Sequence, residues 1–174
     1  MILGMNVLTF VHVVISLVAI VAGLVVAYGL LTARRLEFWT ALFLITTVIT
    51  SVTGFLFPIE RITPGLVLGG LSLIVLALAI TAKYYHHLAG RWRVIYVVTA
   101  IVALYFNVFV LVAQLYQKVP ALNALAPTQS EPPFLVTQLA VLVLFVLLTA
   151  AAIVRSRALP GYAGAAMPLA RHGV

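Results

Sequence analysis

The hydrophobic positions of the chain gather in five long stretches that are separated by short polar segments. The stretches do not alternate apolar and polar residues, as the strands of a membrane β-barrel would. Each has the length, roughly 17–25 residues, that an α-helix needs to cross the hydrocarbon core of a bilayer. The pattern therefore predicts an all-α, polytopic membrane bundle of five transmembrane helices. The predicted spans are Val7–Leu31, Phe38–Phe57, Leu66–Ala82, Val94–Leu115 and Phe134–Val154.

Residues that begin or end helices lie between these stretches. Pro58 predicts the end of the second span, because the residue before a proline is pushed out of the helical conformation. Pro64 predicts the start of the third span and Gly90 its end. Ser130 and Glu131, followed by two prolines, predict a cap and the first turn of the fifth span. The short joins predict that spans one and two, and spans three and four, form antiparallel hairpins.

Basic residues fall almost entirely on one side of this five-span arrangement. By the positive-inside rule, the imbalance predicts an outer N-terminus and a cytoplasmic C-terminus. Only Arg61 and Lys118, of ten basic residues, fall on the other side. The eight on the predicted cytoplasmic side are Arg34, Arg35, Lys83, Arg91, Arg93, Arg155, Arg157 and Arg171.

The basic side predicts contact with anionic lipid headgroups, each basic residue near the surface being worth about 1 kcal/mol. All of the eight except Arg171 are predicted to contact headgroups. The basic residues are dispersed over short loops, so we expect no nucleic-acid partner. Residues 1–157 are predicted to form one transmembrane domain, and residues 158–174 an Ala/Gly/Pro-rich cytoplasmic tail.

Composition excludes a water-soluble globule and narrows the chemistry. The chain is 65% hydrophobic and 7% charged, with a mean hydropathy of +1.26, whereas soluble domains carry about 25% charged residues. It has no Cys and no Asp, and its only acids are Glu37, Glu60 and Glu131. Thiol chemistry, Cys-bound metals and most two-carboxylate mechanisms are therefore excluded, which favours a protein that is not an enzyme.

His12 lies about two turns into the first predicted span from its outer end. Ser16, Ala19, Gly23 and Ala27 follow it on the same helix face, and small residues at that spacing make the close-packing face of a membrane helix. We therefore expect His12 to point into the bundle. Two interpretations stay open: a neutral imidazole hydrogen-bonded to a neighbouring helix, or a ligand- or proton-handling site.

Further polar residues are predicted at a similar depth or on the loops just above it. Grouped in this way they predict a ligand pocket in the outer half of the membrane; the alternative is a set of separate interhelical hydrogen bonds. The hydroxyl residues of the second span, among them Thr47, Thr50 and Thr53, are interpreted as packing. The predicted ligand-binding residues are His12, Asn107, Gln114, Gln138, Glu131, Glu60, Arg61 and Lys118.

A haem between two histidines is not expected. His86 and His87 lie near the cytoplasmic side and His12 near the outer side, and adjacent residues on one helix do not both face one iron. We therefore predict no metal and no resident cofactor, and keep haem or a quinone as the less favoured alternative.

The loop after the fourth span is similar in sequence to a stretch found in other membrane proteins. Residues 117–134, QKVPALNALAPTQSEPPF, followed by Thr137 and Gln138, resemble a stretch of small multi-spanning proteins of bacterial inner membranes. The resemblance implies the bacterial inner membrane as the compartment, and no activity. Within this loop, Pro120–Ala126 is predicted to form a short helix in the interface.

Three classes of function remain. The favoured class is a non-enzymatic membrane protein that binds a lipid-like or quinone-like molecule in the outer-half pocket, or that serves as an accessory subunit of a membrane complex. The alternatives are a small oligomeric transporter or channel, and a membrane redox or haem protein. Whether the partner is a second copy or another membrane protein is left open.

Overall fold

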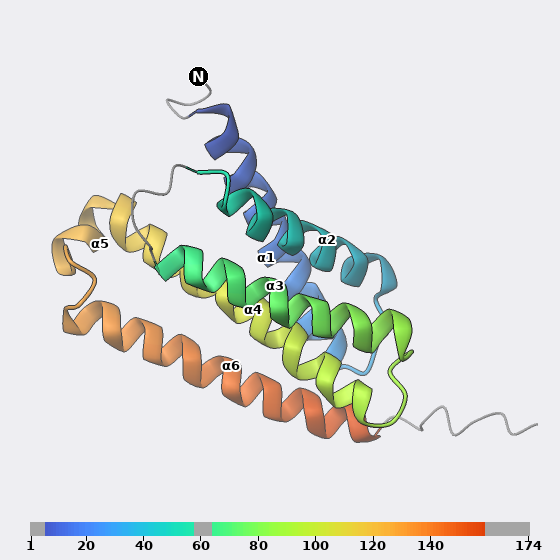
Figure 1. Cartoon of the computed structure of the whole chain (residues 1–174). Helices are drawn as coiled ribbons and strands as arrows, with labels where there is room; N and C mark the ends of the chain where they lie inside the picture. The colour runs from blue at the N-terminus through green and yellow to red at the C-terminus, as the bar shows by residue number, and fades with distance from the viewer. Residues whose placement is uncertain (1–5, 58–63, 159–174) are drawn as a thin grey trace, which may run out of the picture.

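The computed structural model describes residues 6–57 and 64–158, most of which are helical (Figure 1). Five helices are long and apolar enough to cross a membrane, the third continuing into the π-helix η1. The described ranges contain no strand, so the predicted all-α bundle of five spans is confirmed. The elements are α1 (Val7–Leu31), α2 (Glu37–Gly54), α3 (Pro64–Ile80), η1 (Thr81–Tyr85), α4 (Arg91–Lys118), α5 (Pro120–Leu125) and α6 (Pro132–Ala158).

The long helices lie side by side, with α4 in the middle. α1 packs along α2, and α3 along α4, as the predicted antiparallel hairpins, and α6 returns along α4. α4 also contacts α1. The turns after α1 and η1 lie at one end of the molecule together with the end of α6, and we call this the basic end (Figure 1). The start of α1 and the short helix α5 lie at the opposite end, the α5 end.

Small residues let α1 approach the centre of the bundle. Ala19, Gly23 and Ala27 are buried, as the stripe of small residues predicts. Gly23 faces both α4 and α2: a methyl group on it would lie 2.5 Å from Cδ1 of Leu104 and 2.8 Å from Cε2 of Phe43. A side chain at this position would therefore push the helices apart.

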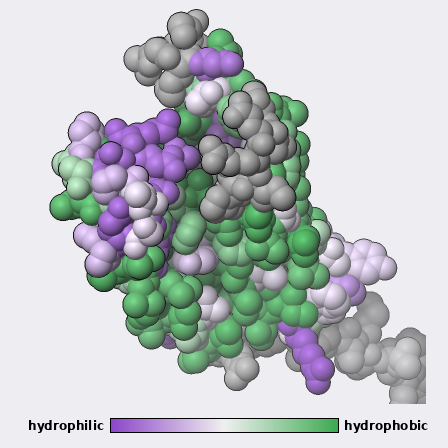
Figure 2. Space-filling model, turned by 60° about the vertical axis from the view of Figure 1, so that its left-hand side comes forward, coloured by the Kyte–Doolittle hydropathy of each residue, from purple (hydrophilic) through white to green (hydrophobic). Residues whose placement is uncertain are grey.

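The outer surface of the bundle is apolar. Leu139, Leu144 and Leu147 of α6 are among many large aliphatic side chains that face outward. Figure 2 shows this hydrophobic surface together with a hydrophilic cluster beside α5. An aqueous protein of this size rarely exposes so much apolar area, so the chain is an integral membrane protein.

The second span ends earlier than the sequence predicts. α2 stops at Gly54, three residues before Phe57. The N–H groups of Phe55 and Leu56 bond to Val52 and Thr53, so the last turn tightens to i→i+3 hydrogen bonds. The helix thus ends three residues before the predicted boundary, and Pro58 itself lies outside the described residues.

The prediction that Gly90 ends the third span is wrong. The helix passes into η1 and stops at His86, followed by positive φ angles at His87 (49°) and Leu88 (59°). Gly90, with φ 52°, instead precedes the first residue of α4. The wider π-turn, which a hydropathy pattern does not encode, closes the helix before the glycine is reached.

The connection between α4 and α6 largely follows the sequence. The short helix predicted over Pro120–Ala126 is present as α5, one residue shorter. α6 begins at Pro132, and the residue that caps it is Glu131 rather than Ser130, because the N–H groups of Phe134 and Leu135 bond to the Glu131 carbonyl.

Candidate functional site

His12 lies on α1 and hydrogen-bonds to α2. Its Nδ1 is 2.8 Å from Oγ1 of Thr53, and Oγ1 of Thr53 is 2.7 Å from the carbonyl oxygen of Ile49. A hydroxyl group has one hydrogen, and here Thr53 donates it to its own helix. The Thr53 oxygen therefore accepts from Nδ1–H, and in the neutral imidazole this leaves Nε2 as the unprotonated nitrogen.

Nε2 of His12 has no hydrogen-bond partner among residues 6–57 and 64–158. Beside the ring, a methyl group on Gly54 would meet only Cε1 of His12, at 3.9 Å. The ring of Phe57 stands edge-on to the imidazole, with 5.2 Å between the ring centroids. The imidazole thus lies between the ring of Phe57 and the open side of Gly54, and it has one nitrogen without a hydrogen-bond partner there.

Two hydroxyl groups extend the polar seam between α1 and α2. Ser16 donates to the carbonyl of His12 at 2.7 Å and lies 3.5 Å from Oγ1 of Thr50. His12 thus faces α2 and makes the interhelical hydrogen bond of the first interpretation, while its role in binding a ligand or a proton stays a prediction. The partner of His12, Thr53, is one of the hydroxyl residues of the second span that the sequence analysis interpreted as packing. The sequence signal that could have identified Thr53 as the partner is the spacing of these hydroxyl residues along the face of α2 that meets α1.

Asn107 and Gln138 make interhelical hydrogen bonds of their own. Nδ2 of Asn107 donates to Oγ1 of Thr47 at 3.3 Å. Nε2 of Gln138, on α6, donates to the carbonyl of Phe109 in α4 at 3.1 Å. Oε1 of Gln138 is buried and has no partner among the described residues. An acceptor left in this state within a bundle carries a desolvation cost.

Glu131 binds its own loop. Its carboxylate accepts hydrogen bonds from the N–H groups of Thr128 and Ser130, both at 3.1 Å, and from the Thr128 hydroxyl at 2.9 Å. Partial burial raises the pKa of this carboxyl, but the hydrogen bonds together outweigh that effect and hold its pKa below the ordinary value of 4.5. The carboxylate is thus a fixed part of the cap on α6.

Side-chain amides fasten the loop around α5 to α4. Gln129 donates to the carbonyl of Ala113 at 2.6 Å, and Asn123 to the carbonyl of Tyr116 at 3.2 Å. The Tyr116 hydroxyl lies 2.9 Å from Oγ1 of Thr137. These bonds were not predicted from the sequence, because each of them joins two residues that the sequence analysis placed in different spans or loops.

The predicted outer-half residues are thus distributed over several contacts. His12, Asn107 and Gln138 bond to three different partners, while Gln114 and Lys118 are exposed. Glu60 and Arg61 lie outside the described residues. A shared pocket for this group stays a prediction.

The basic residues divide into two sets. Arg34, Arg35, Lys83 and Arg93 border a cavity at the basic end. Arg91 and Arg155 are exposed and are not among its lining residues. The side chain of Arg157 lies outside the described part of the chain. Headgroup contact by these residues stays a prediction.

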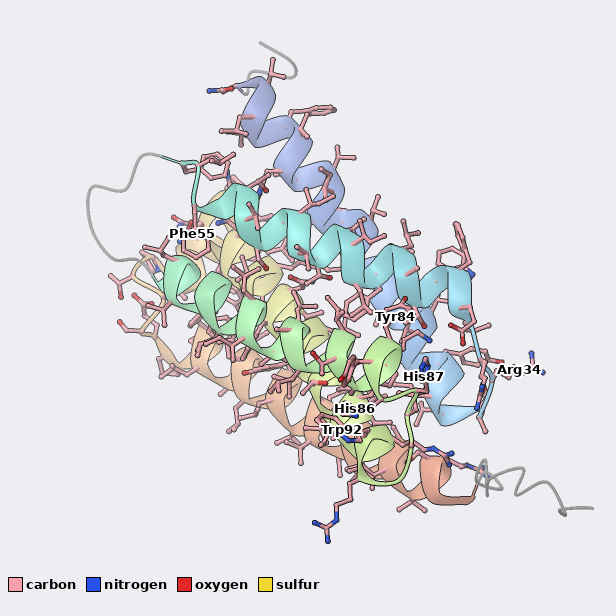
Figure 3. The ribbon with its side chains drawn as sticks, turned by 45° about the vertical axis from the view of Figure 1, so that its right-hand side comes forward. Arg34, Phe55, Tyr84, His86, His87 and Trp92 are labelled. Carbon is pink, nitrogen blue, oxygen red and sulfur yellow. The ribbon has the colours of Figure 1, made fainter. Side chains whose placement is uncertain are left out.

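The histidines at the basic end lie beside aromatic residues. His86 stacks on Trp92, with ring centroids 3.6 Å apart and planes 6° apart (Figure 3). Tyr85 meets the other side of His86 edge-on at 4.8 Å. In the described ranges, no three side chains of His, Asp or Glu come together as metal ligands.

Comparisons of the chain with protein-family models, with curated protein sequences and with solved structures found no match. The function therefore has to be argued from the side chains themselves. Two places stand out in the described residues: the imidazole of His12 with its neighbours Thr53 and Phe57, and the cavity at the basic end.

Proposed function

We propose that the protein is a non-enzymatic membrane protein that binds a lipid-soluble, hydroxyl-bearing molecule of the hydroquinone type at His12. The observation that carries the proposal is the hydrogen-bond arrangement of the imidazole. Nδ1–H donates to Thr53, so that Nε2 of the neutral ring keeps a lone pair, and the ring of Phe57 lies beside the imidazole. A buried or half-buried acceptor of this kind is stabilised by a ligand that donates a hydrogen bond.

The residues beside His12 favour a ring-shaped ligand. Phe57 stands edge-on to His12, and Gly54 leaves the adjoining space without a side chain. Aromatic rings pack well against such an edge. The hydroxyl of a hydroquinone donates to Nε2, whereas the carbonyl of the oxidised quinone only accepts, and the imidazole turns no N–H toward it.

The compartment and orientation belong to the same proposal. The basic end carries almost all of the cations, so it faces the cytoplasm according to the positive-inside rule, and the chain resides in a bacterial inner membrane. His12 then lies in the half of the bilayer that faces away from the cytoplasm, where a lipid-soluble ligand reaches it through the membrane.

The test is equilibrium binding of decylubiquinol, a short-chain hydroquinone, and of decylubiquinone to the full chain in nanodiscs. We expect the reduced form to bind more tightly than the oxidised form. His12→Phe keeps a ring but removes the acceptor, and it should weaken binding of the reduced form by roughly three- to tenfold, the worth of one hydrogen bond.

The matched control is Thr99→Val. Thr99 is a buried membrane residue whose hydroxyl bonds only to its own helix, at the carbonyls of Ile95 and Tyr96. Binding by this variant should equal that of the wild type. Equal affinity for the two redox forms, or retention of full affinity by His12→Phe, would contradict the proposal.

A further inference from the structure

A partly enclosed cavity of about 150 Å³ opens at the basic end, between α1, α2, α4 and α6. One water molecule takes up about 30 Å³ of the liquid, so the cavity has room for a small oxyanion but not for a whole lipid. Its walls are mostly apolar. The charged residues that border it are Arg34, Arg35, Glu37, Lys83 and Arg93.

Lys83 brings a buried positive charge to this cavity. It lies in η1, and its side chain is only 8% exposed. The ammonium lies near the rings of Tyr84 and Tyr96, 5.5 and 5.8 Å from their centroids, which favours a cation at this position. A buried charge nevertheless requires a counter-charge.

Glu37 supplies that counter-charge from the solvent side. Its Oε2 accepts from Nζ of Lys83 at 2.6 Å, but its side chain is 64% exposed. Buried Lys83 therefore needs the ion pair more than exposed Glu37 does. Glu37 keeps its hydration when its side chain turns outward, whereas Lys83 loses its counter-charge. Another oxyanion that enters the cavity removes this cost, so the carboxylate is exchangeable.

The opposite wall of the cavity is also cationic. Nη1 of Arg93 donates to the carbonyl of Ser156 on α6 at 3.0 Å, which fixes the guanidinium at the wall. Four basic residues border the cavity against the single acid Glu37. The resulting positive potential favours a bound anion, and Lys and Arg are the usual protein partners of phosphate.

We infer that the cavity binds the phosphate group of an anionic phospholipid, which takes the place of Glu37 on Lys83. The site lies where α1 ends and α2 begins, the level of the headgroups for a membrane-spanning bundle. The apolar walls suit the glycerol end of a lipid better than free phosphate. This site is at the opposite end from His12 and does not depend on the function proposed there.

The experiment measures retention of phosphatidylglycerol and of phosphatidylcholine by native mass spectrometry of the full chain. Lys83→Gln should retain phosphatidylglycerol about tenfold or more weakly, because it removes a charged hydrogen-bond donor. Glu37→Gln should retain it several-fold more strongly, because the internal competitor is gone. The control, Arg91→Gln, removes an exposed cation of the same end that does not border the cavity, and should weaken retention less than Lys83→Gln does.

A thermal-shift measurement distinguishes replacement of Glu37 by a lipid phosphate from general attraction of anionic lipid to the basic surface. Glu37→Gln leaves Lys83 without its carboxylate, so the variant should melt below the wild type in phosphatidylcholine and recover in phosphatidylglycerol. The melting temperatures of Glu37→Gln in the two lipids test the inference even if Lys83→Gln does not fold.

Three outcomes overturn the inference. The first is that Glu37→Gln retains no more phosphatidylglycerol than the wild type does. The second is that Arg91→Gln weakens retention as much as Lys83→Gln does. The third is that inorganic phosphate stabilises Glu37→Gln as well as phosphatidylglycerol does, since that result would make free phosphate the ligand.

Discussion

Gly23 of α1 and Leu104 of α4 meet so closely that a methyl group on the glycine would lie 2.5 Å from Cδ1 of the leucine. Both residues are buried in the middle of the bundle. Phe43 of α2 also packs against Gly23, so α1, α2 and α4 meet at a position that has no side chain. Packing of this kind is the main source of stability between membrane helices, since lipid and side chain are equally apolar.

Gly23→Ala should therefore destabilise the bundle by about 1–3 kcal/mol, the usual cost of overpacking a close-packed interior. The measurement is reversible unfolding in mixed micelles, followed by circular dichroism.

Gly70→Ala is the matched control. A methyl group on Gly70 of α3 meets no atom within 4 Å, and replacing an interior helical glycine by alanine favours the helix by roughly 0.5–1 kcal/mol. Gly70→Ala should thus be neutral or stabilising. Equal losses in the two variants would show that glycine flexibility, and not contact with Leu104, matters.

The spans were predictable because membrane thickness sets their length. Val7–Leu31 is α1 to the residue, and the remaining spans differ from the observed helices only at their ends. The ends are less predictable because they depend on local hydrogen bonding: the tightened last turn of α2 and the π-turn before His86 have no hydropathy signature.

The cavity at the basic end was not predictable from charge alone. Lys83 and Glu37 are 46 residues apart and look like separate surface charges in the sequence. Their pairing follows only from the packing of α2 beside the end of α3. Thr53 is missed as the partner of His12 for the same reason, since hydroxyl residues in a span most often bond to their own backbone.

Acid should loosen the cap on α6. The pKa of Glu131 lies below its ordinary value in the folded protein, so the stabilisation by its hydrogen bonds is fully present above the ordinary pKa. It is lost as the pH falls through the lower, folded-state pKa. The melting temperature of the wild type should therefore approach that of Glu131→Gln in this acidic range.

The comparison needs melting curves of both proteins in the same detergent from neutral pH downward. The difference between the two melting temperatures should be constant at neutral pH and shrink only below the ordinary pKa of a glutamate. A difference that does not change with pH would show that the Glu131 carboxylate does not stabilise the cap.

His12 should carry its proton on Nδ1. Nitrogen-15 NMR of histidine-labelled protein reports the tautomer directly, and Thr53→Val removes the oxygen that selects it. This variant should lose the preference and roughly 0.6–1.7 kcal/mol of stability, the range for hydrogen bonds between membrane helices. Thr50→Val is the control, since the Thr50 hydroxyl lies 3.5 Å from that of Ser16 and makes no hydrogen bond to the imidazole among the described residues. A proton on Nε2 in the wild type would contradict the assignment.

Two substitutions of Gln138 distinguish the contribution of its hydrogen bond from the contribution of its volume to the contact between α4 and α6. Gln138→Leu removes the bond to the Phe109 carbonyl, but that carbonyl lies within α4 and keeps its helical partner. The same change removes the buried Oε1 that lacks a partner among the described residues. The two effects oppose each other, so the loss of stability should stay below about 1 kcal/mol. Gln138→Ala leaves a void as well and should cost more, about 2 kcal/mol or above. Unfolding of both variants in micelles checks the order, and equal losses of about 2 kcal/mol or above in the two variants would mean that the amide bond, rather than the packing, holds α6 to α4.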